Sequence, residues 1–215
     1  MHYCQRCPAP VLMEAEPPWA RCPDCSSTEP SLVAPLFVVT GASGSGKSTV
    51  FPVLSNVLSE CAVFDVDWLI DPLKRITPDK GVDWENFRDA WLSVAHGVAQ
   101  SGRATVLLGP VFAEQLEASP ARRWIGPIHY AVLHCADATR RARLQNRPIW
   151  RARQIEENVS FARYLREHAE LSVSTDELTP VQVAGELAEW VREKLGSPSS
   201  SGPHRIRSTA KRGER

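Results

Sequence analysis

The chain has 215 residues, of which 43% are hydrophobic, and this suits a single α/β domain with a small appendage. Its 25 basic and 25 acidic side chains give a formal net charge of zero. No apolar run approaches the ~20 residues that cross a bilayer, and the N-terminus has no basic segment followed by an apolar one. We therefore expect no membrane partner and no secretory signal, and a cytoplasmic, reducing location.

Three regions of the chain differ in composition. Residues 1–30 hold four of the six cysteines and six of the seventeen prolines, and residues 31–196 alternate apolar runs with amphipathic stretches. Residues 197–215 carry five basic side chains, one acidic side chain and a single large aliphatic one, so we expect a disordered basic tail. With the tail at +4, the remainder of the chain is at −4, which gives no reason to expect nucleic acid as a partner.

Two Cys-x-x-Cys pairs lie in residues 1–30. Cys4 and Cys7 form the first pair, Cys22 and Cys25 form the second, and 14 residues separate the pairs. This spacing resembles that of small zinc ribbons, in which four thiolates complete a tetrahedron and leave no open position for catalysis. A proline-rich segment of this length has too little core to fold alone, so structural zinc would stabilise it. The alternative is that the four cysteines form two disulfides, but disulfides are rare in a reducing compartment.

Residues 31–196 are predicted to alternate strands and helices. Short apolar runs indicate strands over 36–40, 61–65, 104–108, 128–135 and 171–174. Helical spacing of apolar residues indicates helices over 48–60, 84–100, 138–146, 153–170 and 181–195. Because strands separated by helices favour parallel pairing, we expect an α/β domain with helices on both faces of a parallel sheet.

A nine-residue loop follows the first predicted strand and matches the pattern G-x-x-x-x-G-K-[ST] in full. We expect its members to bind a nucleoside triphosphate: Gly41, Ala42, Ser43, Gly44, Ser45, Gly46, Lys47, Ser48 and Thr49. Glycines let the backbone curl so that N–H groups point at phosphate oxygens, and the positive end of the next helix attracts the same anion. Lys47 would reach the β- and γ-phosphates, and the Ser48 hydroxyl would ligate Mg²⁺. The alternative is a flexible turn, which needs no Lys-Ser-Thr at this spacing.

Two further pairs of charged residues and one loop follow the predicted strands. Asp65 and Asp67 end the second strand, where residues two apart face the same side and the carboxyl ends of strands meet a ligand. Arg143 and Arg147 follow the fourth strand and, four residues apart, would share one helix face. Thr175 follows the fifth strand, before the last amphipathic helix.

With these motifs, residues 35–195 resemble the P-loop kinases of small molecules and nucleotides, such as shikimate, gluconate and adenylate kinases. The resemblance implies a P-loop NTPase three-layer sandwich with a five-stranded parallel sheet in the order 2-3-1-4-5 and a mobile lid. It also implies transfer of the γ-phosphate of ATP, with Mg²⁺, to a nucleoside, nucleotide or sugar-type acceptor. No acid ends the third strand, where motor ATPases carry one, and this favours a kinase.

The resemblance also implies a role for each motif residue. Asp65 would serve Mg²⁺ through its water shell, and Asp67 would orient or deprotonate the acceptor. Arg143 would stack on the adenine and Arg147 would reach the phosphates, since a planar guanidinium suits both tasks. Thr175 would border the nucleotide pocket. The acceptor segment would run from residue 67 to residue 102.

Other interpretations stay open at this point. Asp65 and Asp67 could cap the following helix, and Arg147 could belong to a solvated helix face. Arg140 and Arg141 are expected to be solvated, whereas Arg151 and Arg153, in the predicted lid, are further candidates for γ-phosphate contacts. The protein could instead be an ATPase or regulatory protein that contacts a partner through the zinc ribbon, or an ATP-binding protein without catalysis.

Overall fold

The computed structural model describes residues 3–76, 81–147 and 154–196. Two parts of the sequence-based predictions fall outside these ranges: the arginines of the predicted lid, Arg151 and Arg153, and the predicted basic tail, residues 197–215. Within the described ranges, no helix is both long and apolar enough to cross a membrane.

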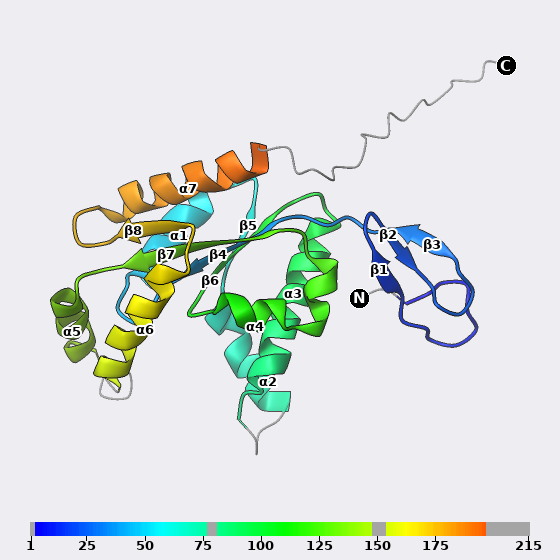
Figure 1. The fold of residues 1–215 in the computed structure, drawn as a ribbon, viewed down its shortest axis with the longest axis horizontal. Coiled ribbons are helices and arrows are strands. Elements are labelled where there is room, and N and C mark those ends of the chain that lie inside the picture. Colours follow the sequence, from blue (N-terminus) through cyan, green and yellow to red (C-terminus); the bar gives the residue numbers. More distant parts are fainter. Residues whose placement is uncertain (1–2, 77–80, 148–153, 197–215) are drawn as a thin grey trace.

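A five-stranded parallel sheet forms the centre of the larger domain (Figure 1). Its strands are β4 (Leu36–Thr40), β5 (Ala62–Asp65), β6 (Thr105–Leu108), β7 (Ile128–His134) and β8 (Leu171–Ser174). Their order across the sheet is β5-β6-β4-β7-β8, and β4 pairs in parallel with both β6 and β7. Numbered within this sheet, the order is 2-3-1-4-5, which confirms the predicted topology. The carboxyl ends of all five strands therefore lie at one edge.

Helices connect these strands. The α-helices are α1 (Lys47–Val57), α2 (Ile70–Ile76), α3 (Trp84–Ala99), α4 (Ala113–Glu117), α5 (Asp137–Gln145), α6 (Ile155–Glu167) and α7 (Pro180–Gly196), and the short 3₁₀ helices are η1 (Val66–Leu69) and η2 (Pro120–Trp124). The five predicted helices all appear, with ends shifted by up to three residues. Sequence periodicity missed α2, α4, η1 and η2, because these elements are too short to show it.

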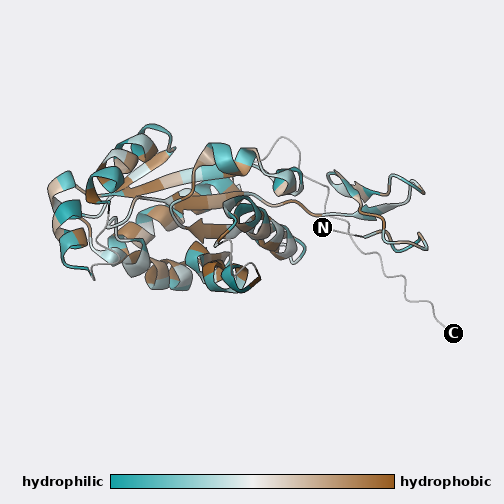
Figure 2. Ribbon diagram, turned by 90° about the horizontal axis from the view of Figure 1, so that it is seen from below, coloured by the Kyte–Doolittle hydropathy of each residue, from teal (hydrophilic) through white to brown (hydrophobic). Residues whose placement is uncertain are grey.

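The sheet has a hydrophobic layer on each face, so the larger domain is a three-layer sandwich. Phe37 and Val39 of β4 face the first layer, where α1 and α7 contribute Leu54 and Leu187. Their neighbours in the strand face the second layer, which contains residues of α3 and α4. Figure 2 shows the hydrophobic strands enclosed by helices whose outer sides are hydrophilic.

The N-terminal segment forms a small separate sheet with antiparallel strands, β1 (Glu14–Glu16), β2 (Trp19–Arg21) and β3 (Thr28–Pro30). We call residues 3–30 the ribbon; in Figure 1 it projects from one end of the larger domain. Trp124 of η2 is buried in a cluster with ribbon residues that include Met13 and Ala20. Gln100, at the end of α3, donates to the Leu32 carbonyl (2.8 Å) and accepts from its amide (3.1 Å). The ribbon is therefore docked on η2, and the segment that follows the ribbon is bound to the C-terminal end of α3.

Candidate active site

The predicted phosphate loop connects β4 to α1. Gly44 (φ 84°) and Gly46 (φ 96°) adopt left-handed backbone conformations that only glycine enters freely. α1 begins after Gly46 without a side-chain cap. In the described part of the chain, the N–H groups of Gly44, Gly46 and Lys47 donate to no protein acceptor. Uncapped amides at a helix N-terminus attract anions, so the geometry of this loop suits a phosphate group.

Lys47 points back into the loop that carries it. Its Nζ donates to the carbonyl oxygens of Gly41 and Ala42, the second at 3.3 Å. Burial lowers the pKa of Lys47 to about 8, while the nearby carboxylates of Asp67 and Asp65 act in the opposite direction. A bound triphosphate would replace the carbonyl partners and favour the charged amine.

The carboxylates of Asp65 and Asp67 both lie close enough to Lys47 to raise its pKa. Their positions do not come from alternation along one strand. β5 ends at Asp65, and Asp67 lies in the 3₁₀ turn η1, so the expectation that both residues share one strand face is wrong. Asp65 Oδ1 accepts a hydrogen bond from the Asp67 amide at 3.0 Å. One oxygen of Asp65 thus caps η1, as the capping interpretation predicts, and this bond sets the direction in which the chain leaves β5.

A close approach between two loops holds η1 in place. A side-chain carbon at Gly109, just after β6, would overlap the side chain of Val66. The indole N–H of Trp91, which is 3% exposed, donates to the Val66 carbonyl at 3.0 Å. Glycine at 109 and a buried tryptophan on α3 therefore fix the turn that presents Asp67.

Arg143 and Thr175 lie together, as the predicted nucleotide pocket requires. Arg143 Nη1 donates to the Thr175 hydroxyl at 2.9 Å and to the Gly44 carbonyl at 3.1 Å, and its Nη2 donates to the Thr175 carbonyl at 2.9 Å. A Cβ at Gly46 would lie 3.5 Å from Thr175. The loop after β8, helix α5 and the phosphate loop therefore meet at one place.

Three side chains from the segments that flank the predicted lid converge on Ser43. Arg147 Nη1 donates to the Ser43 hydroxyl at 3.0 Å, and Asn158 Oδ1, on α6, accepts from the Ser43 amide at 3.1 Å. Arg140 Nη1 donates to the Ser43 carbonyl at 2.7 Å. Ser43 therefore links α5 and α6 to the phosphate loop, and Arg147 is not simply a solvated helix-face charge.

Arg140 is buried, so the expectation that it is solvated is wrong. Its side chain is fully buried, and its Nε and Nη2 have no hydrogen-bond partner among the described residues. Burial lowers the pKa of this guanidinium, and its positive charge also lowers the pKa of Lys47. Arg141 is the solvated residue of the pair and makes a surface ion pair with Glu156 at 2.8 Å. The sequence pattern alone could not separate these two neighbours, because only packing decides which one faces inward.

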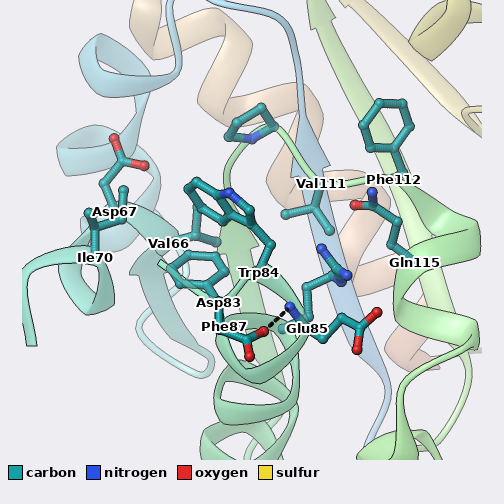
Figure 3. A pocket seen from close by; sticks show the side chains of 12 residues that line it. Val66, Asp67, Ile70, Asp83, Trp84, Glu85, Phe87, Val111, Phe112 and Gln115 are labelled. Atoms are coloured by element: carbon teal, nitrogen blue, oxygen red, sulfur yellow. Dashed lines mark hydrogen bonds between the residues drawn. The ribbon is translucent and has the colours of Figure 1, made fainter. Parts of the chain in front are cut away.

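A cavity of about 740 Å³ opens beside Asp67 (Figure 3). Its lining comes from η1, α2, α3 and the segment after β6: Val66, Asp67, Ile70, Asp83, Trp84, Glu85, Phe87, Arg88, Pro110, Val111, Phe112 and Gln115. The predicted acceptor segment, residues 67–102, supplies seven of these twelve residues: Asp67, Ile70, Asp83, Trp84, Glu85, Phe87 and Arg88. Residues 110–115 are the part that the sequence analysis missed, although their place after a parallel strand could have indicated them.

The four cysteines of the ribbon also come together. Their sulfur atoms all lie within 4.8 Å of one another, with 3.6 Å between Cys4 and Cys25 and 3.6 Å between Cys7 and Cys22. A zinc tetrahedron with Zn–S bonds of ~2.3 Å has edges of about 3.8 Å, so this arrangement fits the ion. Hydrogen bonding to Ser27 lowers the pKa of Cys4 and of Cys25, which favours the thiolate form of these two ligands, whereas burial raises the pKa of Cys7.

The sequence matches no protein-family profile and no curated protein. Solved structures do resemble it. The tunicamycin resistance protein of Deinococcus radiodurans is 20% identical, with a TM-score of 0.56 over 74% of this chain and 95% of that chain. A sugar kinase from Janibacter sp. is 17% identical, with a TM-score of 0.54 and the same coverage, 74% and 95%. The APS kinase of Mycobacterium tuberculosis is 18% identical, with a TM-score of 0.50 over 76% and 99%.

This chain has the P-loop kinase fold. At these identities the similarity concerns the fold, and any function has to be argued from the residues of the site. The P-loop kinase fold brings the phosphate loop, Asp65 and Asp67 to the carboxyl edge of the sheet. It leaves the acceptor open, because a fold does not by itself determine which ligand its site binds.

Proposed function

We propose that this protein is an ATP-dependent phosphotransferase that moves the γ-phosphate to a small-molecule acceptor. One observation carries the proposal. Asp67 lines the 740 Å³ cavity, and its charge acts on Lys47 of the phosphate loop. A phosphate held by the loop and an acceptor in the cavity would therefore meet beside one carboxylate, which is the arrangement that in-line phosphoryl transfer requires.

Each residue around the loop has a part in this proposal. The loop amides and Lys47 bind the phosphates, Arg147 adds positive charge near them, and Arg143 and Thr175 border the base. Asp67 orients the acceptor hydroxyl and takes its proton.

Mg²⁺ would be held by the Ser48 hydroxyl and, through water, by Asp65. Ser48 lies exposed in the first turn of α1. Asp65 ends β5, and only one of its two carboxylate oxygens accepts the hydrogen bond that caps η1. The donor set suits Mg²⁺, which prefers few protein oxygens together with water and phosphate. Bound there, the ion would neutralise charge on the transferred phosphate.

The ribbon is proposed to be a structural zinc site, with residues 1–30 forming the ribbon segment and residues 31–196 the kinase domain. Four thiolates occupy every position of a tetrahedral ion, which leaves none for substrate. The neighbouring structures are named as a sugar kinase, an APS kinase and a tunicamycin resistance protein, so they support a range of small acceptors rather than one.

The test is transfer of labelled γ-phosphate from ATP to a panel of nucleosides, nucleotides, sugars and aromatic alcohols. Label should appear on an added acceptor, and Lys47→Ala should lower the rate by on the order of 10³-fold without changing the melting temperature. Lys194→Ala is the matched control, because Lys194 pairs with Glu170 on the surface. Hydrolysis of ATP at the same rate with and without every acceptor would favour the ATPase alternative and contradict the kinase assignment.

A further inference from the structure

The charged residues that line the cavity beside Asp67 are mostly acidic. The lining contains one cation, Arg88, and three carboxylates, those of Asp67, Asp83 and Glu85. An acceptor that carries a phosphate or several carboxylates brings negative charge into this field, where like charges at close range repel. Sites that select such anions normally present several arginine or lysine side chains, and the described lining presents one.

One of the acidic residues is already used by the fold. Asp83 accepts from the amides of Glu85 (3.0 Å) and Asn86 (3.1 Å) through one oxygen, and from the Asn86 side chain (2.9 Å) through the other. Asp83 is therefore the cap of α3 and has little capacity left for a ligand. The dashed line in Figure 3 marks its bond to the Glu85 amide.

Aromatic rings form the main apolar surface of the cavity. Trp84 and Phe87, on α3, contact each other edge to face at 5.3 Å, and Trp84 is 55% exposed. Figure 3 shows Asp67 on one side of Trp84 and Phe112 with Gln115 on the other. A large aromatic side chain half in water and half in a cavity is a ready stacking surface for a planar ligand.

Phe112 is held firmly by the helix behind it. Its ring lies 4.7 Å from that of Phe161 and 5.4 Å from that of Tyr164, both on α6, and the Tyr164 hydroxyl donates to Glu114 at 2.8 Å. An aromatic wall that is fixed before the ligand arrives loses little conformational freedom on binding.

The balance of polar and apolar groups also argues against a sugar or polyol. Seven of the twelve lining residues are apolar, so most hydroxyl groups of a polyol would lose water without gaining a hydrogen bond. A molecule with one flat ring system and few hydroxyl groups avoids this loss, and the volume is ample for it.

We infer that the acceptor is an uncharged alcohol with a planar aromatic ring system, a class that includes nucleosides and aryl alcohols. The inference rests on the proposed kinase function. The ring lies against Trp84 and Phe112, which brings a hydroxyl to Asp67. The acceptor oxygen forms a bond to the γ-phosphorus while the bond from that phosphorus to the β–γ bridging oxygen breaks; ADP leaves, and the hydroxyl proton passes to the Asp67 carboxylate.

The experiment compares a neutral acceptor with a charged one in each of two pairs, and both members of each pair keep one free primary hydroxyl. One pair is 4-(hydroxymethyl)benzamide and 4-(hydroxymethyl)benzoate, and the other is thymidine and thymidine 3′-monophosphate. Binding to the full-length protein saturated with a non-hydrolysable ATP analogue is measured by calorimetry, and transfer is measured with labelled ATP. In at least one pair the neutral member should bind and react at least 10-fold better than its charged partner. The pair that responds distinguishes a nucleoside from an aryl alcohol.

Two variants connect the preference to the cavity. Trp84→Ala and Phe112→Ala should each raise the acceptor KM about 10-fold with little change in the affinity for Mg·ATP, and Trp84→Phe should restore part of the loss. Trp19→Ala, which removes an exposed tryptophan of the ribbon, is the control. Equal or better binding of the charged partners in both pairs, or better use of a polyol, would overturn the inference. Binding of a neutral member with no transfer of label would instead overturn the kinase assignment.

Discussion

The larger domain and the ribbon fold by different means. The domain has two hydrophobic layers built from buried strand and helix residues, such as Val38, Leu54 and Leu107, none more than 1% exposed. The ribbon has a single small cluster, and its largest member, Trp124, belongs to the domain. A segment with so little core depends on cross-links or metal for its order. The two parts should therefore respond to different perturbations, and in the described part of the chain the hydrophobic cluster around Trp124 joins them.

The largest expected effect lies in the domain and leaves the ribbon intact. Asp67→Asn should lower kcat by roughly 10²–10⁴-fold, because the amide cannot take the acceptor proton. The affinity for Mg·ATP and the zinc content should stay the same, as measured by calorimetry and metal analysis. Asp71→Asn, an exposed carboxylate on α2, is the matched control. If Asp67→Asn keeps a rate within threefold of the parent protein, Asp67 has no role in proton transfer.

The converse perturbation acts on the ribbon. Cys22→Ser, or removal of zinc by a chelator, should abolish the order of residues 3–30 and expose Trp124, with a red shift of tryptophan fluorescence. Binding of Mg·ATP should change by less than about threefold, since the phosphate loop contacts no ribbon residue among those described. Cys61→Ser, at a buried cysteine of the domain, should keep one zinc ion per chain. Loss of nucleotide binding on chelation would show that the two parts are not independent.

Lys47 provides a pH-dependent test confined to the phosphate loop. Its pKa of about 8 lies below the ~10.4 of a free lysine, and a bound triphosphate favours the charged form. Binding above pH 8 should therefore take up a proton, and the affinity for Mg·ATP should fall about fivefold from pH 8 to pH 9. Calorimetry in buffers of different ionisation enthalpy measures the uptake. Lys47→Arg stays charged over this range and should take up no proton; uptake by both proteins would assign the proton to another group.

The smallest expected effect concerns the link between α6 and the phosphate loop. Asn158→Ala removes the acceptor of the Ser43 amide, and the loss of one hydrogen bond of about 0.5–1.5 kcal/mol should raise the KM for ATP by roughly two- to tenfold. Asn158→Asp keeps an acceptor and should recover most of the affinity. Asn146→Ala, at an exposed position after α5, is the control. An unchanged KM in Asn158→Ala would mean that α6 does not steady the loop.

The phosphate loop and the cysteine pairs are the two groups of residues whose structure follows most directly from the local sequence. In both, the residues that act together lie within a short stretch or follow a fixed spacing, so local geometry determines much of the result. Glycine at 44 and 46 permits the left-handed turns, and each Cys-x-x-Cys turn places two sulfurs side by side. The sheet order was predicted from the family resemblance rather than from local pattern.

Tertiary structure alone decided the remaining features of the site. Ser43 meets Asn158 across 115 positions of sequence, Arg140 turns inward while Arg141 stays in water, and Asp67 leaves the strand because a cap at Asp65 begins a 3₁₀ turn. None of these follows from spacing, since each depends on which elements pack against one another across the sheet. The sequence by itself determined the conformation of the glycine-rich loop and which thiols group together. Packing decided which charged side chains surround that loop and which residues line the cavity beside Asp67, because burial and long-range contact are properties of the folded chain.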